Sequence, residues 1–181
     1  MFSAVLCDFG GVILSSPFEA FNRYERAGFD AAFAADSDAR GHRIAGADVL
    51  ALLAGDVRPE MVRALDRVRE AGYRTACLTN NVAPSDHHVA GPDERAALIA
   101  SILGRFDAVV ESSKVGVRKP EPRFYEIACE LLDVDPSECV FLDDLGITLK
   151  PAAALGMRTI KVLNAAQAIN DLSETLDLDL S

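Results

Sequence analysis

Five short apolar segments are spaced along the chain, and they most constrain what it can fold into. Each is rich in Val, Ile, Leu, Cys and Phe and is apolar throughout, without alternation between apolar and polar residues. A strand that is buried on only one face alternates, so these continuous runs predict strands of a sheet covered on both faces. The predicted strands are residues 3–8, 74–79, 107–111, 138–143 and 158–162.

Helical patterns lie between these strands. Residues 59–71 begin with a proline, and both this segment and residues 121–133 place apolar side chains at i, i+3, i+4 and i+7. Strand and helix thus alternate, which predicts an α/β fold: a doubly wound, Rossmann-like, mostly parallel sheet with helices on both faces. The apolar residues of the two patterns are Met61, Ala64, Leu65 and Val68, and Phe124, Ile127, Ala128 and Leu131.

Residues 17–57 differ in character from the rest. They combine a helical pattern, an alanine-rich stretch, a polar "DSDARGHR" and the apolar patch "ADVLALLAG". We expect a core domain formed by residues 1–16 and 58–181 and a reduced helical cap insertion at 17–57; an irregular connection is the alternative. The tail from 165 onward is either a closing helix over the sheet or a frayed end.

The composition narrows the possible partners. Eighteen basic residues against 28 acidic ones give 181 residues a net charge of −10, which argues against affinity for nucleic acid or an anionic membrane. No apolar run approaches the roughly 20 residues of a membrane span, and the N-terminus lacks a basic patch. We therefore expect a cytoplasmic protein whose four cysteines, Cys7, Cys77, Cys129 and Cys139, are buried reduced thiols.

Polar residues follow the predicted strands at their carboxyl ends. Asp8 ends the first strand, Thr79 and Asn80 end the second, and Asp143 and Asp144 end the fourth. Ligands of doubly wound sheets bind beyond these ends, so the chemistry is expected at one edge. Adjacent carboxylates repel one another unless a cation lies between them, and Mg²⁺ prefers carboxylate oxygens together with water and phosphate.

Four segments together resemble the motifs of the haloacid dehalogenase-like hydrolase superfamily. They are "CDFGGVIL", "CLTNN", "VGVRKPEPRFYEIACELL" and "CVFLDDLGITLKPAAALGM". The last two are similar to the phosphatase-like N-terminal domain of soluble epoxide hydrolase and its bacterial relatives. The resemblance covers about residues 1–16 and 58–162, and the four motifs occur in the family's order.

The resemblance implies a magnesium-dependent phosphohydrolase that acts on a small phosphate ester. Asp8 is the expected nucleophile, which forms an aspartyl-phosphate and also binds the metal. The backbone carbonyl of Gly10 and the Asp144 carboxylate are the other expected Mg²⁺ ligands, with Asp143 beside them. Thr79, Asn80 and Lys119 are expected to bind phosphate, and Lys119 also to stabilise the transferred group. Asp8 as a turn cap and Asp143 or Asp144 as a helix cap are the structural alternatives.

This chain departs from the family pattern at Gly10. The family's first motif normally reads D-x-D, and its second Asp protonates the leaving alcohol and later activates water. Gly10 keeps the carbonyl, and the two glycines of "DFGG" let the chain turn toward the metal, but the proton donor is lost. Positioned acid–base catalysis is worth about 10²- to 10⁴-fold, so the loss should fall on alkyl phosphates more than on acyl or aryl phosphates.

Two other functions stay open. One is a phosphate- and metal-binding regulatory module with little turnover, which the missing acid and the short insertion favour. The other is a 2-haloacid dehalogenase, which needs no metal and would leave the acidic pair unexplained. The short insertion could also be completed by a second copy in a homodimer. His87 and His88 lie in a Pro- and Gly-containing segment and are assigned no role.

Overall fold

The computed structural model describes residues 1–16, 55–80 and 94–180. Its centre is a five-stranded, fully parallel sheet with strand order β3-β2-β1-β4-β5. The strands are β1 (Ala4–Asp8), β2 (Arg74–Thr79), β3 (Ala108–Glu111), β4 (Cys139–Asp143) and β5 (Arg158–Lys161). The predicted strands are therefore confirmed to within a residue at each end. Most of the predicted cap and both His87 and His88 lie outside the described residues.

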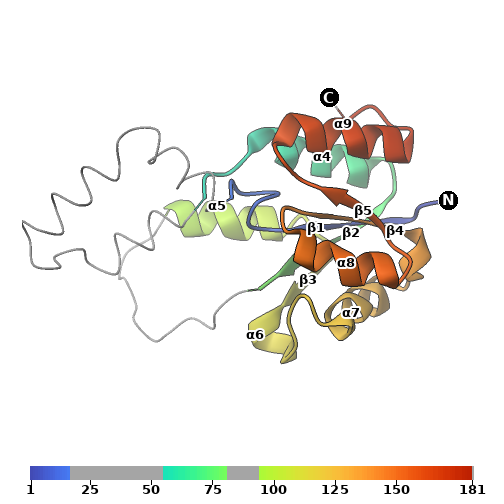
Figure 1. Cartoon of the computed structure of the whole chain (residues 1–181). Coiled ribbons are helices and arrows are strands. Elements are labelled where there is room, and N and C mark those ends of the chain that lie inside the picture. The colour runs from blue at the N-terminus through green and yellow to red at the C-terminus, as the bar shows by residue number, and fades with distance from the viewer. Residues whose placement is uncertain (17–54, 81–93, 181) are drawn as a thin grey trace, which may run out of the picture.

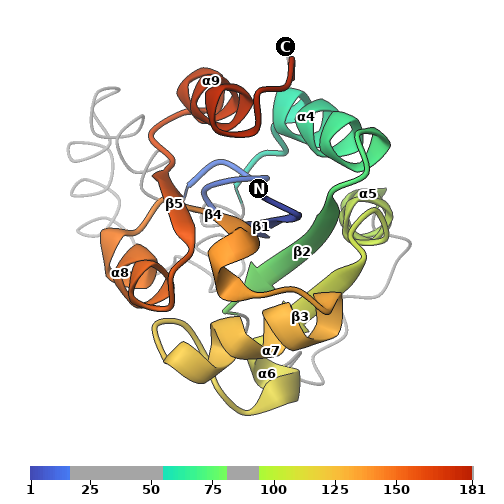
Figure 2. The same ribbon diagram turned by 90° about the vertical axis from the view of Figure 1, so that its right-hand side faces the viewer.

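Helices cover both faces of this sheet, as predicted (Figures 1 and 2). One face carries α4 (Pro59–Glu70), α5 (Glu94–Leu103) and α9 (Ala165–Leu176). The other carries α6 (Ser112–Val115), α7 (Pro122–Leu132) and α8 (Gly146–Ala154), and a short 3₁₀ helix, η1 (Pro136–Glu138), precedes β4. In the described part of the chain, no helix is both long and apolar enough to cross a membrane.

The packing of α4 and α9 follows from their apolar spacing. In α4 the buried residues are the four that the sequence pattern predicts, Met61, Ala64, Leu65 and Val68, and Pro59 occupies the first turn. The tail forms α9, so the closing-helix alternative is correct; its buried residues include Ile169 and Leu172. Burial of a side chain of this size is worth about 1.5–3 kcal/mol, so α9 contributes to stability as well as covering the sheet.

The predicted buried face of α7 is wrong in part. Phe124 and Ala128 are buried as expected, but Leu131 is 58% exposed and Ile127 is only half-buried. Tyr125, Cys129 and Leu132 are buried in their place, because the helix turns these side chains toward the sheet and α8. The buried Tyr125 hydroxyl donates to the Thr148 carbonyl of α8 at 2.6 Å, so its polar atom is satisfied.

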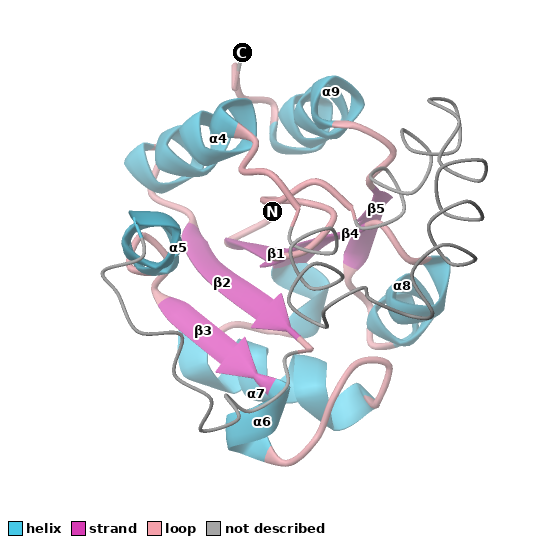
Figure 3. Ribbon diagram, turned by 90° about the vertical axis from the view of Figure 1, so that its left-hand side faces the viewer, coloured by secondary structure: helices cyan, strands magenta, loops and turns pink. Residues whose placement is uncertain are grey.

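The strand order places β1 at the centre, between β2 and β4. All five strands point the same way, so the residues at their carboxyl ends meet at one edge of the sheet, the side that faces the viewer in Figure 3. The register pairs Asp8 with Leu78 and Cys7 with Leu142. The ends of β1, β2 and β4 are therefore level with one another, which brings their polar residues together.

Candidate active site

Asp8 and Lys119 form a buried ion pair at this edge. Lys119 lies in the loop before α7, and its Nζ is 2.6 Å from Asp8 Oδ1 and 2.9 Å from Asp143 Oδ2. The Lys119 side chain is only 3% exposed, and the Asp143 side chain 1%. A buried ammonium between two carboxylates is satisfied by both, and it places one positive charge directly beside Asp8.

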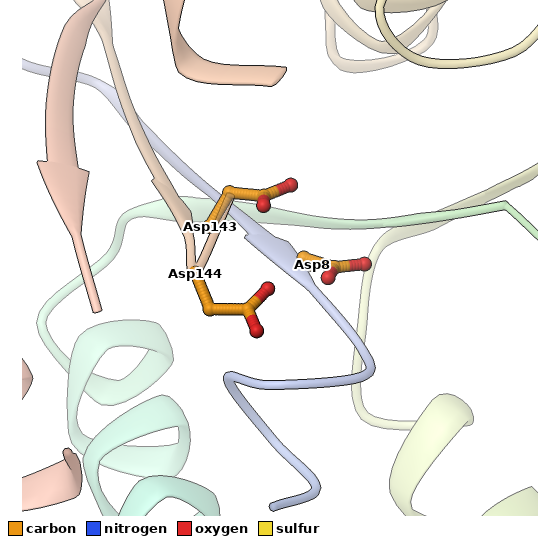
Figure 4. Close-up of side chains that lie close together, drawn as sticks. All are labelled: Asp8, Asp143 and Asp144. Carbon is orange, nitrogen blue, oxygen red and sulfur yellow. The ribbon is translucent and has the colours of Figure 1, made fainter. Parts of the chain in front are cut away.

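Asp8, Asp143 and Asp144 converge (Figure 4). Each offers a carboxylate oxygen, and these three oxygens lie within 4.8 Å of one another. Asp143 also accepts a hydrogen bond from the Leu145 backbone N–H at 2.8 Å, and Asp144 accepts one from the Ser16 hydroxyl at 2.8 Å. An all-oxygen donor set of this size fits a hard divalent cation such as Mg²⁺ better than a soft metal.

The close approach of these groups changes their pKa values. Burial, and secondarily the charge of Asp143, raises the pKa of Asp8 to about 6, although Lys119 opposes the shift. Burial, together with the charge of Asp143, also raises the pKa of Asp144, against the hydrogen bond from Ser16. Burial alone would lower the pKa of Lys119, but Asp8 and Asp143 raise it above its ordinary value. The single positive charge of Lys119 therefore does not neutralise the three carboxylates, and a bound cation would stabilise their charged forms.

Asn80 holds Lys119 in place. Its side-chain amide donates to the Lys119 carbonyl at 2.9 Å and accepts from the Lys119 backbone N–H at 2.9 Å. These two bonds fix the orientation of the Asn80 amide, and they use one of its two N–H donors. The sequence motif did not reveal this positioning contact, because the two residues are 39 positions apart.

Every residue predicted for the site borders one pocket. The pocket has a volume of about 250 Å³. Its lining includes the predicted residues and also Ser16, Leu145 and Thr148. The predicted residues that line it are Asp8, Gly10, Thr79, Asn80, Lys119, Asp143 and Asp144.

The two glycines after Asp8 have different roles. Gly11 has φ +90°, and a Cβ placed on it would overlap the Asp144 carboxyl group. Gly10 has no positive φ, and within residues 1–16, 55–80 and 94–180 no atom beyond its chain neighbours lies within 4 Å of a Cβ placed on it. Of the two glycines that were expected to let the chain turn, Gly11 is the one that backbone conformation and space require, whereas Gly10 has an ordinary φ.

Arg58 supports the loop after β1 and was not predicted. This residue is only 8% exposed, and its Nη1 donates to the Gly11 carbonyl at 2.6 Å and to the Val12 carbonyl at 3.3 Å. Backbone carbonyls thus satisfy a buried guanidinium. Ser16 was missed as well. A lone arginine before a helix and a serine after a loop carry no local pattern that indicates such contacts.

The segments that flank the insertion are bonded to each other. The Ser15 N–H donates to the Asp56 carbonyl at 2.7 Å, and the Asp56 N–H donates to the Ser15 hydroxyl at 2.8 Å. Leu14 and Val57 form an antiparallel bridge. The chain therefore leaves and re-enters the core at one place beside the pocket.

Known proteins resemble this chain over most of its length. The family model described as haloacid dehalogenase-like hydrolase matches residues 18–156. Mouse acyl-CoA dehydrogenase family member 10 is 40% identical over 122 residues, which is 67% of this chain and 11% of that protein. Pig bifunctional epoxide hydrolase 2 is 36% identical over 120 residues, 66% of this chain and 21% of that protein. The chain thus spans only a tenth to a fifth of these relatives.

A solved structure gives the fold comparison. It is a HAD family enzyme of Bacteroides thetaiotaomicron, crystallised with magnesium and inorganic phosphate. The two structures align with a TM-score of 0.57 at 19% identity, over 89% of this chain and 94% of that one. At this identity the likeness supports the shared fold.

Proposed function

The chain belongs to the haloacid dehalogenase-like hydrolase family, and from this we propose that it is a magnesium-dependent phosphohydrolase that uses Asp8 as its nucleophile. The observation that carries the proposal is the contact of the Lys119 ammonium with Asp8 at 2.6 Å, beside a cluster of three carboxylates. Phosphoryl transfer needs a nucleophile, a positive group and a cation in one place.

Each residue has a proposed part in the reaction. An Asp8 carboxylate oxygen attacks phosphorus, the bond from phosphorus to the leaving oxygen breaks, and the aspartyl-phosphate forms. The Lys119 ammonium, the Thr79 hydroxyl and the Asn80 backbone N–H stabilise the phosphoryl oxygens. Water then attacks phosphorus and releases Asp8 and inorganic phosphate. Asp8, Asp144 and the Gly10 carbonyl, with Asp143 beside them, would hold Mg²⁺, which when bound supplies positive charge to the phosphoryl oxygens.

Gly10 restricts the proposed substrates to phosphates with good leaving groups. No side chain at position 10 can give a proton to the leaving oxygen, and among the described residues none beyond its chain neighbours comes within 4 Å of a Cβ placed there. Acyl and aryl phosphates release a stable anion without that proton, whereas alkyl phosphates need it. We infer that a small acyl or aryl phosphate is turned over faster than an alkyl phosphate.

Hydrolysis of acetyl phosphate, 4-nitrophenyl phosphate and glycerol phosphate tests the proposal. We expect Mg²⁺-dependent turnover of the first two that is lost in excess EDTA and in Asp8→Asn, with glycerol phosphate slower by about 10²-fold or more. Gly10→Asp should raise the glycerol phosphate rate selectively. Equal rates of the natural chain and Gly10→Asp on glycerol phosphate would show that Gly10 does not limit the substrate range.

The regulatory module is the second candidate, because Gly10 removes the usual proton donor. In that case the natural chain would bind Mg²⁺ and phosphate but release no phosphate from any of the three compounds. Only the Gly10→Asp variant would be active. A dehalogenase would instead release halide from a 2-haloacid in EDTA. The three converging carboxylates of Asp8, Asp143 and Asp144, which we call the acidic triad, favour the metal-dependent reaction, since a dehalogenase needs no metal and leaves them unexplained.

A further inference from the structure

Two cysteine thiols face each other away from the candidate active site. Cys129 lies in the last half of α7, and Cys139 is the first residue of β4. Their Sγ atoms are 3.8 Å apart, and one S–H donates to the other sulfur. The single S–H of Cys139 can donate to the Asp135 carbonyl at 3.4 Å instead of to Cys129. The proposed phosphohydrolase reaction makes no use of either thiol.

The two thiols differ in access. Cys129 lines a surface hollow of about 520 Å³, together with residues of α7, of η1 and of the turn between them. Cys129 is 4% exposed and Cys139 is completely buried. A small molecule in this hollow therefore meets Cys129 first, with Cys139 directly behind it.

The two thiols also differ in reactivity. A hydrogen bond from Cys139 lowers the pKa of Cys129, despite burial and nearby carboxylates that raise it. The same contact, together with burial, raises the pKa of Cys139. Since the thiolate is the nucleophile, this pKa difference and the position of Cys129 at the hollow favour Cys129 as the attacking thiol and Cys139 as the resolving one.

Charge around the hollow selects the reactant. Its lining includes the carboxylates of Glu126, Glu130, Asp133, Asp135 and Glu138, of which Arg123 pairs with Glu126 and Glu130. The excess negative charge repels anionic oxidants such as glutathione disulfide. A neutral hydroperoxide is not repelled. A bound metal is disfavoured, because in the described part of the chain the acidic triad is the one group of three or more metal-ligating side chains that converges.

We propose that Cys129 and Cys139 form a redox site, at which a hydroperoxide oxidises the two thiols to an intramolecular disulfide. The Cys129 thiolate attacks the hydroperoxide, the O–O bond breaks, and a sulfenic acid and an alcohol or water form. Cys139 then attacks the Cys129 sulfur, an S–S bond forms, and water leaves. The sulfurs lose two electrons, which the hydroperoxide gains. The bond joins α7, the helix that follows Lys119, to β4, the strand that ends in Asp143.

Thiol mapping of the native, reduced protein with one equivalent of hydrogen peroxide tests this. After alkylation and digestion, we expect two of the four cysteines to resist alkylation and Cys129 and Cys139 to be found joined, with full recovery after dithiothreitol. Four alkylated thiols, or a bridge that involves Cys7 or Cys77, would overturn the proposal. Cys7 and Cys77 are register neighbours on β1 and β2, so they serve as an internal control.

Two single variants separate the attacking thiol from the resolving one. In Cys139→Ala, the sulfenic acid on Cys129 has no resolving partner, so dimedone should label Cys129. In the matched Cys129→Ala, labelling of Cys139 should be at least about tenfold weaker, because its sulfur is buried behind the hollow. Equal labelling in both variants would contradict the assigned order of reaction, and no labelling in either would overturn the site.

Discussion

At the scale of single residues, Lys119 connects the charges of the site. Its ammonium contacts Asp8 and Asp143 at hydrogen-bond distance, and it lies 5.9 Å from the centre of the Phe141 ring. A fixed, buried positive charge next to the proposed nucleophile Asp8 costs no reorganisation during the reaction, so we expect it to contribute more to catalysis than a surface lysine does.

Replacement of Lys119 should show whether this lysine contributes to catalysis by more than its general positive charge. Lys119→Met should lower kcat/KM for 4-nitrophenyl phosphate by about 10²- to 10³-fold, because one positive group is lost from the transferred phosphoryl. The matched control is Lys114→Met, since Lys114 is 73% exposed and pairs with Glu111 at the surface. Similar losses in the two variants would show that Lys119 acts through general charge only.

The raised pKa of Asp8 leads to a prediction about the stability of the protein in metal-free buffer. Burial raises its pKa to about 6, so between about pH 4 and pH 6 the folded chain keeps a proton that the unfolded chain has lost. The free energy of unfolding therefore falls as the pH rises through this window. Asp8→Asn removes this contribution and should be more stable than the natural chain at pH 7.5 by about 1–3 kcal/mol, with the difference vanishing below pH 4.

Urea unfolding in EDTA at several pH values measures this difference. Asp179→Asn is the control, because Asp179 is 82% exposed and should show no such dependence on pH. A natural chain that is more stable than Asp8→Asn at pH 7.5 without metal would mean that Lys119 stabilises the Asp8 carboxylate by more than its burial costs.

At the scale of elements, the turn after β1 brings the strand ends into contact. Gly11→Ala would force a side chain into the Asp144 carboxyl at a positive φ, so we expect Mg²⁺ affinity to fall at least tenfold and stability to fall by about 1–3 kcal/mol. Gly10→Ala is the matched control, since position 10 has an ordinary φ and, among the described residues, has space for a Cβ. Calorimetric Mg²⁺ titration compares them; equal affinities would show that Asp144 is not held by this turn.

The sequence predicted elements better than contacts between them. Apolar runs and helical spacing are local, so β2 was predicted at its observed bounds and α4 to within a residue. The α7 face was misjudged because its apolar residues allow two overlapping stripes, and only packing on the sheet selects Tyr125 and Cys129 over Leu131. The short α6 and the helix α5 were not specified from the sequence.

In the candidate site, too, the local features were predicted and the contacts between distant residues were not. Strand ends placed Asp8, Thr79 and Asp143 together, because parallel strands bring their carboxyl ends to one edge. The contacts of Asn80 with Lys119 and of Ser16 with Asp144 join positions 39 and 128 apart. Such pairs depend on how loops fold over the sheet, and a single sequence carries no periodic signal for them.

At the scale of the whole molecule, we propose that the core folds without residues 17–54. The flanking segments are already joined by the Ser15–Asp56 hydrogen bonds and the Leu14–Val57 bridge. Replacement of residues 17–54 by a short Gly/Ser linker should therefore leave a core that unfolds cooperatively. Since we propose that residues 17–54 form a cap over the site, their removal should also lower turnover by admitting water.

Circular dichroism and urea unfolding of the shortened chain measure the core, and 4-nitrophenyl phosphate hydrolysis measures the site. The control protein keeps residues 17–54 and receives, within them, an insertion of the same Gly/Ser linker that replaces them in the shortened chain. A shortened chain without a cooperative transition would place the domain boundary elsewhere. Size-exclusion chromatography of both proteins tests whether residues 17–54 mediate the expected homodimer.

The central place of β1 also determines when the site can be assembled during synthesis. Ala4 pairs with Arg74 on one side and with Cys139 on the other, so β1 completes its pairing only after β4 has been synthesised. Pairings this distant in sequence close late, because the loop entropy must be overcome first. Asp8 is therefore synthesised well before Lys119, Asp143 and Asp144, and it meets these three residues only after β4 has been made. A nascent chain stalled before that point has the proposed nucleophile without the charges that we expect to make it reactive.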